Sequence, residues 1–431
     1  GSAALPAWAR PVSRAASLRR PDSLPFPRLP AGTRTLPEIE HIVVLMMENH
    51  SFDNLLGMVP HQVPGRGRVD GLTVTAGRLT NFNRDRSGAR VYAQAATSPC
   101  QLAHEPSQTW DASHQAYANG ANSGFVAASG PVAMRFWDGD DLPFTYSLAR
   151  QFPIGERFFC SVLAQTFPNR RYLFTGTSSG LTATNLLQSL RLPAVNGTIW
   201  DRLDAHGIDW TIYYQNLPTW LIVPGVFTPP RVLRQRRMTS FFTDAAAGRL
   251  PAFTFLDPQY TTTSEENPQD IQVGEEFVAK VVNAIMHAPT WKSTALFITY
   301  DEHGGYYDHV PPPPAIKPDA IAPILAPGQP PLAPGGFDRY GFRVPLIVVS
   351  PWARADYVSR VVQDHTSITA FIERTWNLPA MTFRDANAHP MTDYFDFATP
   401  AFAHPPRLAA APGLAHGLAA CHAAGLHPPL P

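Results

Sequence analysis

Three short runs of apolar residues stand out along the chain. Residues 39–47, 295–300 and 344–349 are dominated by apolar and β-branched side chains, and the first run contains neither glycine nor proline. This pattern is typical of strands buried on both faces of a parallel sheet. We therefore predict three buried strands, each of which ends abruptly at polar residues.

Amphipathic stretches separate these runs. Residues 274–287 place apolar side chains at helical spacing, and residues 367–376 form a second helix-like segment. Strands that alternate with helices predict an α/β fold with a largely parallel central sheet, in which ligands bind beyond the carboxyl ends of the strands.

Less regular segments interrupt this alternation. Residues 60–141 and 218–237 are predicted to be insertions that form a lid or rim over the sheet. We expect an N-terminal extension over residues 1–38 and one α/β domain over residues 39–400. The Ala- and Pro-rich tail, residues 401–431, is expected to pack loosely or fray.

Composition narrows the function classes. The chain holds 34 basic (Lys+Arg) and 34 acidic residues, so its formal charge of zero provides no bulk field for nucleic acid, and we expect no nucleic-acid partner. No apolar run approaches the roughly 20 residues that span a bilayer. The three cysteines lack Cys-x-x-Cys spacing, which excludes a zinc knot but is compatible with one disulfide. Cys160 is expected to be a buried thiol.

Carboxylates follow two of the predicted strands. Glu48 and Asn49 end the first strand, and Asp301 and Glu302 end the second. Hard oxygen ligands of this kind suit a divalent cation, with Mg²⁺, Ca²⁺, Mn²⁺ and Zn²⁺ all open. Each residue taken singly has an alternative, as a helix cap near Ser51 or an ordinary loop charge. Taken together, they favour a metal site, because buried carboxylates need a counter-charge.

A hydroxyl group lies close to a predicted helix start. Thr166 begins the segment Thr-Phe-Pro-Asn-Arg, and a hydroxyl in this position most often caps the helix. The same position stabilises anions, so an alkoxide there would be a competent nucleophile towards phosphorus. Asn169 and Arg170 could then hold phosphate oxygens.

Four histidines lie in loops that follow strands or surround the predicted site. His303 and His309 flank a Gly-Gly-Tyr-Tyr-Asp turn, His365 lies in Asp-His-Thr-Ser, and His104 lies in Leu-Ala-His-Glu-Pro. A single histidine more often satisfies hydrogen bonds than performs chemistry. Their clustering after strands favours a place near the substrate.

These motifs together resemble those of the bacterial phospholipase C and acid phosphatase family, which includes the plant non-specific phospholipases C. The resemblance runs from about residue 39 to about residue 388. The matching segments are 47–53 (Met-Glu-Asn-His-Ser-Phe-Asp), 166–170 with 175–177 (Thr-Gly-Thr), 301–305 (Asp-Glu-His-Gly-Gly) with 308–312 (Asp-His-Val-Pro-Pro), 364–367 (Asp-His-Thr-Ser) and 384–388 (Arg-Asp-Ala-Asn-Ala).

The resemblance implies an alkaline-phosphatase-like α/β fold and hydrolysis of phosphate esters through a phosphorylated Ser or Thr. It places the nucleophile on Thr166 and a phosphate-pocket histidine on His104. His303 and His365 fall close to the substrate, without a defined role for His365. The metal ligands fall on Glu48, Asn49, Asp301 and Glu302.

One position departs from the family pattern. The family often has Glu-His-Pro where this chain has Glu266-Asn267-Pro268. Asn267 can donate a hydrogen bond to a phosphate, but it cannot titrate near pH 6. We expect an altered pH profile, a different leaving group or reduced activity.

The resemblance leaves several functions open. The expected activity is a phospholipase C acting on phospholipid phosphodiesters, with transient contact with a membrane surface. The alternatives are an acid phosphatase on soluble monoesters and an inactive binding or surface protein that retains the fold. A sulfatase is set aside, because the sequence around Cys160 lacks the required context. Gly1-Ser2 resembles a cloning scar, and family habit implies a secreted or periplasmic protein whose signal peptide has been removed.

Overall fold

A computed structural model describes residues 17–101, 105–224, 228–325, 336–423 and 425–428. Its centre is an eight-stranded sheet with the strand order β11-β10-β12-β1-β13-β14-β8-β15. The strands are β11 (Gln235–Arg237), β10 (Trp210–Tyr214), β12 (Phe253–Asp257), β1 (His41–Met47), β13 (Thr294–Tyr300), β14 (Leu346–Val349), β8 (Ile154–Gly155) and β15 (Val358–Ser359).

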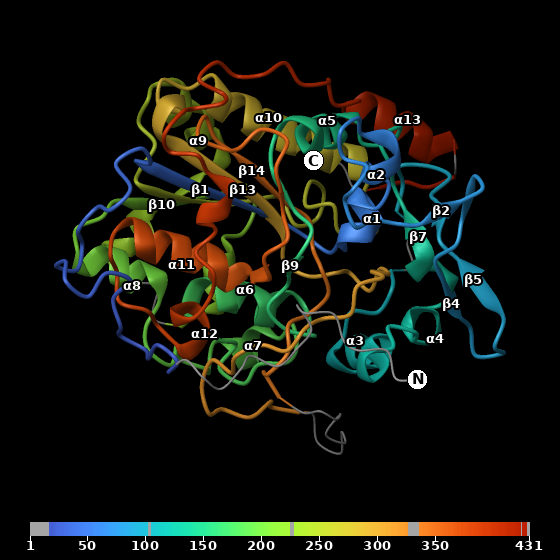
Figure 1. The fold of residues 1–431 in the computed structure, drawn as a ribbon, viewed down its shortest axis with the longest axis horizontal. Coiled ribbons are helices and arrows are strands. Elements are labelled where there is room, and N and C mark those ends of the chain that lie inside the picture. The colour runs from blue at the N-terminus through green and yellow to red at the C-terminus, as the bar shows by residue number, and fades with distance from the viewer. Residues whose placement is uncertain (1–16, 102–104, 225–227, 326–335, 424, 429–431) are drawn as a thin grey trace.

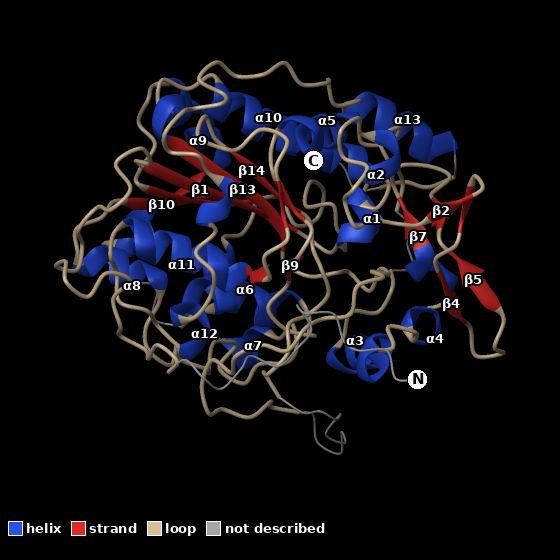
Figure 2. Cartoon of the chain, in the orientation of Figure 1, coloured by secondary structure: helices blue, strands red, loops and turns tan. Residues whose placement is uncertain are grey.

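Five neighbouring strands, from β11 to β13, run parallel. β1 lies in the middle of this group, and its residues from Ile42 to Met47 are fully buried, as the apolar run predicted. Helices cover both faces of the sheet (Figures 1 and 2). The predicted α/β class, with a largely parallel central sheet flanked by helices, is confirmed.

Each face of the sheet has its own set of helices (Figure 1). One face carries α6 (Thr166–Thr175), α8 (Ile199–Ala205), α11 (His365–Thr375) and α12 (Phe383–Ala386). The other carries α5 (Pro143–Gln151), α9 (Met238–Ala246), α10 (Ile271–Met286) and α13 (Leu414–Ala423). α10 starts three residues before its predicted beginning, because the Asp270 side chain caps it by accepting a hydrogen bond from the Gln272 amide.

The third predicted strand runs in the opposite direction to the one expected. β14 is antiparallel to β13, with Leu296 opposite Val349 and Thr299 opposite Leu346. Ser350, which follows β14, therefore lies at the edge of the sheet where β13 begins. The expectation that three strands deliver polar groups to one edge is wrong for β14; of the three predicted strands, β1 and β13 do so.

The first predicted insertion lies beside the main sheet (Figure 1). It contains the short ribbons β2–β3 (Val74–Thr75, Arg78–Leu79) and β4–β5 (Phe82–Arg84, Arg90–Tyr92), and β6 (Gln94–Ala95) paired with β7 (Arg135–Phe136). It also contains the helices α3 (Trp110–Tyr117) and α4 (Phe125–Ser129), which contribute to a small apolar cluster separate from the main core. In the second insertion, β11 joins the main sheet. A lid function of either segment stays a prediction.

The C-terminal tail is more ordered than its composition indicated. Helix α13 packs against α10, and Cys421 at its end forms a disulfide with Cys100. The expectation of a loose tail is therefore wrong for residues 414–423. Cys160 is a buried free thiol, as predicted. Among the described residues, no helix is long and apolar enough to cross a membrane.

Candidate active site

The ends of two neighbouring strands bring the predicted metal ligands to one place. β1 and β13 are parallel, with Met47 opposite Tyr300, so the residues that follow each strand meet at one edge of the sheet. The Asn49 amide donates to Asp301 Oδ1 at 3.1 Å. Glu48, Asn49, Asp301 and Glu302 are all buried. The structure therefore brings this predicted set together.

The turn after β13 lies directly against the end of β1. Gly304 has a φ of +65°, and a Cβ atom there would lie 1.9 Å from the Asn49 carbonyl oxygen, so only glycine fits. The Gly304 amide donates to Glu302 Oε2 at 2.7 Å. The two motifs are thus held in contact by backbone geometry.

Thr166 is the first residue of α6, and its hydroxyl is not used as a helix cap. The N-cap residue is Gln165, and no side chain caps this helix. In the part of the chain that the structure describes, the Thr166 hydroxyl has no hydrogen-bond partner. Thr166 lines a cavity of about 270 Å³ together with Glu48, Arg170 and Glu266. The predicted nucleophile therefore opens into the space beside the strand ends.

Asn169 holds the segment that leads into α6. Its Oδ1 accepts from the Val162 amide at 3.0 Å, and its Nδ2 donates to the carbonyl oxygens of Val162, Ala164 and Gln165. The side chain is fully buried. Its carboxamide is therefore occupied by backbone groups, and the geometry argues against the expected phosphate contact.

Arg170 lies between the carboxylates of the two strand ends. Its guanidinium is 3.3 Å from Glu48 Oε1 and 3.0 Å from Asp301 Oδ2, and Asp257 lies 3.6 Å away. Burial alone would lower the pKa of Arg170, but Tyr260 and these carboxylates raise it above its ordinary value. Arg170 also lines the cavity. Its contact with phosphate stays a prediction, and its role between two carboxylates was not expected.

The two described histidines of the predicted site are buried around it. His303 Nδ1 is 3.2 Å from Glu302 Oε2, and burial lowers the pKa of His303 to about 3, so the ring is neutral. His365 Nε2 lies 2.9 Å from the Tyr300 carbonyl oxygen, behind the end of β13. Both thus support the strand end, and their contact with substrate stays a prediction. His104 lies outside the described residues.

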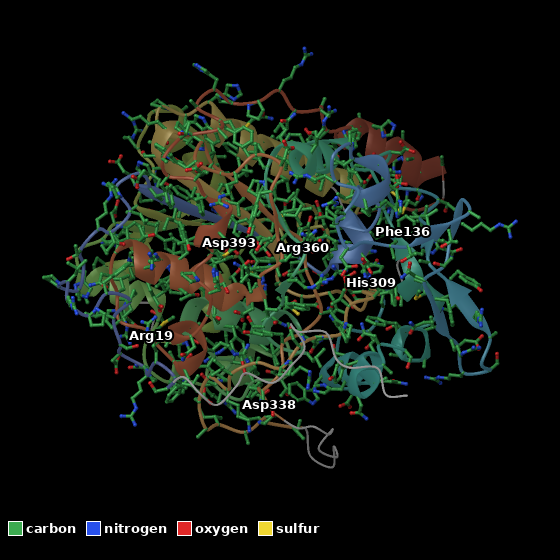
Figure 3. All side chains as sticks on the ribbon, viewed as in Figure 1. Arg19, Phe136, His309, Asp338, Arg360 and Asp393 are labelled. Atoms are coloured by element: carbon green, nitrogen blue, oxygen red, sulfur yellow. A yellow bond between two sulfur atoms is a disulfide. The ribbon has the colours of Figure 1, made fainter. Side chains whose placement is uncertain are left out.

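His309 belongs to a separate, partly buried cluster. Its Nδ1 is 2.7 Å from Asp53 Oδ2 and its Nε2 is 2.8 Å from Asp70 Oδ1. Arg343 pairs with Asp53 and with Asp308 in the same cluster. Figure 3 shows His309 below α1 (Phe52–Leu56), at the junction between the main sheet and the first insertion.

A second cavity, of about 590 Å³, shares part of its lining with the first. Asn267 lines it, and Tyr260 and Glu266 line both cavities. The Tyr306 hydroxyl donates to Asn267 Oδ1 at 2.9 Å. Burial raises the pKa of Glu266 to about 7. The sequence motifs did not predict that Glu266 and Tyr260 line the candidate site, although Glu266 directly precedes Asn267, the position that departs from the family pattern.

The donor atoms fit a divalent cation in their chemistry. Both polar atoms of the Asn49 carboxamide and Oε1 of Glu302 are buried without a hydrogen-bond partner in the described structure. Burial raises the pKa of Glu48 and of Glu302 well above its usual range, and a bound cation would offset their charge.

The carboxylates are nevertheless not gathered as tightly as in a formed metal site. Among the described residues, the one group of three His, Cys, Asp or Glu side chains with ligand atoms mutually within 4.8 Å is Cys100, Asp270 and Cys421. Two of these form the disulfide. Arg170 forms ion pairs with both Glu48 and Asp301 and so supplies positive charge beside them.

The wall of the first cavity is apolar. The side chains that form this wall are Phe167, Leu186, Leu217, Pro218, Leu221 and Ile222. The larger aromatic residues of the two insertions are buried, namely Trp110, Tyr117, Phe136, Trp137 and Trp220; Phe227 lies outside the described residues. Apart from Phe167, which lies in the Thr166 motif, the wall comes from residues outside the motifs.

Comparisons with known proteins identify the family of this chain. The model of the Phosphoesterase family matches residues 39–379. Non-specific phospholipase C1 of Arabidopsis thaliana is 31% identical over 392 residues, which cover 83% of this chain and 71% of that protein. Phospholipase C B of Mycobacterium tuberculosis is 28% identical over 415 residues, covering 85% of this chain and 79% of that one.

A solved structure from Vibrio parahaemolyticus, described as a protein of the alkaline phosphatase superfamily, is 8% identical with a TM-score of 0.41. It covers 84% of this chain and 72% of its own. The family resemblance expected from the motifs is confirmed by the family match and the curated relatives. The chain belongs to the phosphoesterase family and is a phosphoric ester hydrolase.

Proposed function

We propose that the protein is a metal-dependent phospholipase C that cleaves phospholipid phosphodiesters through a phosphothreonine intermediate. The observation that carries this proposal is the placement of Thr166. Thr166 is the first residue of α6, and its unpartnered hydroxyl faces a cavity with carboxylates on one side and an apolar wall on the other. The wall suits the lipid alcohol, and the polar side suits the phosphate.

The reaction divides into two displacements at phosphorus. The Thr166 oxygen forms a bond to phosphorus, the bond from phosphorus to the glycerol oxygen breaks, and that oxygen leaves with the proton lost by Thr166. Water then attacks the phosphothreonine, which releases the phosphorylated head group and restores the hydroxyl. The start of α6 favours this chemistry, because the free amides at a helix N-terminus stabilise negative charge.

The cation would be held by Glu48, Asn49, Asp301 and Glu302. When bound, it would supply Lewis-acid stabilisation of the charge that develops on the nucleophile and the phosphate oxygens. The chain itself contributes position and charge. Arg170 donates to Glu48 and Asp301, which orients both carboxylates, and the start of α6 fixes Thr166 beside them.

Export of the protein is part of the same proposal. The disulfide between Cys100 and Cys421 supports it, because structural disulfides form and persist in oxidising compartments. Detection of the native protein in a culture supernatant or a periplasmic extract tests this part, and recovery from the cytosol alone would contradict it.

Substitution of the nucleophile tests the proposed function. Thr166→Ala removes the attacking oxygen, so we expect hydrolysis of phosphatidylcholine to fall by at least ~1,000-fold. Thr166→Ser keeps an oxygen at the same position and should retain measurable turnover. Both variants should unfold at the temperature of the wild type, because the lost hydroxyl has no partner in the described structure.

The substrate panel decides between the two activities. Turnover of phosphatidylcholine that exceeds turnover of a small aryl monophosphate supports a phospholipase C, and the reverse order supports an acid phosphatase. Near-normal hydrolysis by Thr166→Ala would remove this residue from the mechanism.

A further inference from the structure

Four leucines expose apolar side chains around the mouth of the first cavity. Leu186, Leu187, Leu190 and Leu217 are 46, 72, 38 and 58% exposed. The first three lie on or directly after α7 (Leu186–Ser189), and Leu217 lies in the loop after β10. We call these four residues the rim surface. Leu186 and Leu217 also line the cavity, so apolar surface continues from the solvent to Thr166.

The segments that form the rim surface contain no acidic residue. Residues 165–200 and 210–224 lack aspartate and glutamate entirely, although the chain holds 34 of them. Every ionised side chain in these two segments is an arginine. A surface of this kind meets no electrostatic repulsion from the phosphates of a lipid head-group layer.

A buried arginine holds the rim in place. Arg171 donates to the carbonyl oxygens of Ile222 at 2.9 Å and of Leu192 at 2.8 Å, and to the Ser189 carbonyl at 3.3 Å. Its printed partners are backbone carbonyls and serine hydroxyls, and burial lowers its pKa to about 10. The rim segments are thus fixed to α6, the helix that carries Thr166, and the leucines are held outward.

We propose that the rim surface docks on the lipid–water interface, so that a phospholipid passes from the bilayer directly into the apolar cavity. This inference rests on the proposed phospholipase C function and adds the surface by which the enzyme reaches its substrate. Leucines that a rigid segment holds exposed insert at the head-group boundary of a bilayer, because burial of their apolar surface there lowers the free energy. The occupant is a lipid surface, and a second copy of this chain is the competing occupant.

The test removes leucines that lie outside the cavity. Leu187→Ser/Leu190→Ser leaves the lining residues intact, and Leu187→Ser alone is the milder variant. The matched control is Leu233→Ser, because Leu233 is 80% exposed but lies in a turn whose Arg234 pairs with Asp209, before the start of β10. Leu217 follows the other end of that strand.

Binding is measured by sedimentation with phosphatidylcholine vesicles in a Thr166→Ala background, so that the lipid is not consumed. In the active enzyme, initial rates are compared on vesicles and on soluble p-nitrophenyl phosphorylcholine. The double variant should weaken vesicle binding and slow vesicle hydrolysis by about tenfold or more, with turnover of the soluble ester unchanged. The Leu233→Ser control should match the wild type in all three measurements.

Several outcomes would overturn the docking proposal. These are a wild-type protein that does not bind vesicles, unchanged vesicle binding in the double variant, or an equal loss on the soluble ester. Sedimentation velocity that shows a wild-type dimer dissociated by Leu187→Ser would assign the rim to a second copy instead. Vesicle binding that depends on the leucines, without any hydrolysis of phospholipid, would uphold docking and defeat the lipid substrate of the proposed function.

Discussion

Buried arginines meet their surroundings in different ways in this protein. Arg170 and Arg343 are paired with carboxylates, whereas the partners of Arg171 are carbonyl and hydroxyl oxygens. Burying a cation is costly unless it is paired or hydrogen-bonded, so each of these side chains fixes the segments that supply its acceptors; Nε of Arg171 alone among the Arg171 nitrogens is buried without a partner in the described structure. Two consecutive residues of α6 thereby serve two purposes, because Arg170 orients the strand ends and Arg171 holds the rim.

His309 is the clearest pH-sensitive group outside the candidate active site. Burial alone would lower its pKa, but Asp53 and Asp70 outweigh burial and raise the pKa to about 10. Because the folded pKa lies above the unfolded value of about 6.5, the stabilisation is fully present below that value and is lost as pH rises through 10.

We therefore predict that His309→Gln lowers the free energy of unfolding, with the largest difference from the wild type between about pH 5 and 6.5. The difference should shrink steadily towards pH 10. Urea unfolding at a series of pH values measures it, with the exposed His287→Gln as the matched control. A difference that stays constant from pH 5 to 10 would exclude the aspartate pairing as its cause.

At the level of secondary structure, the candidate metal site is a product of two parallel strands. β1 and β13 are parallel neighbours that end at the same level, so the residues that follow the two strands lie close together. This part of the fold could be predicted from the sequence, because a buried strand that ends at carboxylates is visible as a pattern. The direction of β14 could not, since an antiparallel strand in the same buried sheet has the same apolar run.

The strand-end site predicts a stability change on cation binding. Added singly to chelator-treated protein, at least one of Mg²⁺, Ca²⁺, Mn²⁺ and Zn²⁺ should raise the melting temperature, because a ligand that binds only the folded state stabilises it. A free cation concentration of 100 times the dissociation constant adds about 2.7 kcal/mol to the free energy of unfolding. Glu302→Gln should abolish the increase.

The matched control for Glu302 is Glu275→Gln. Glu275 is a buried carboxyl on α10 that accepts from the Thr145 amide and is not one of the predicted ligands. This variant should keep the cation-dependent increase. If none of the four cations shifts the melting temperature of the wild type, the strand ends do not form a metal site.

The whole molecule assembles its candidate active site from segments that are remote in sequence. Motif resemblance located Thr166 and the carboxylates, but the apolar wall comes from Leu186, Leu217 and Ile222, which carry no motif. Their positions depend on hydrogen bonds from Arg171 to distant carbonyl groups, and no local pattern encodes such contacts. The tail is another case, because its composition indicated fraying while Cys421 ties it to Cys100.

The central claim is that the Thr166 oxygen becomes covalently bonded to phosphorus during turnover. Acid quenching of the enzyme during hydrolysis of p-nitrophenyl phosphorylcholine, followed by peptide mass spectrometry, tests it most directly. We predict a phosphocholine adduct on the peptide that begins α6, localised to Thr166 and absent from Thr166→Ala. An adduct localised to another residue, or its persistence in Thr166→Ala, would contradict the account.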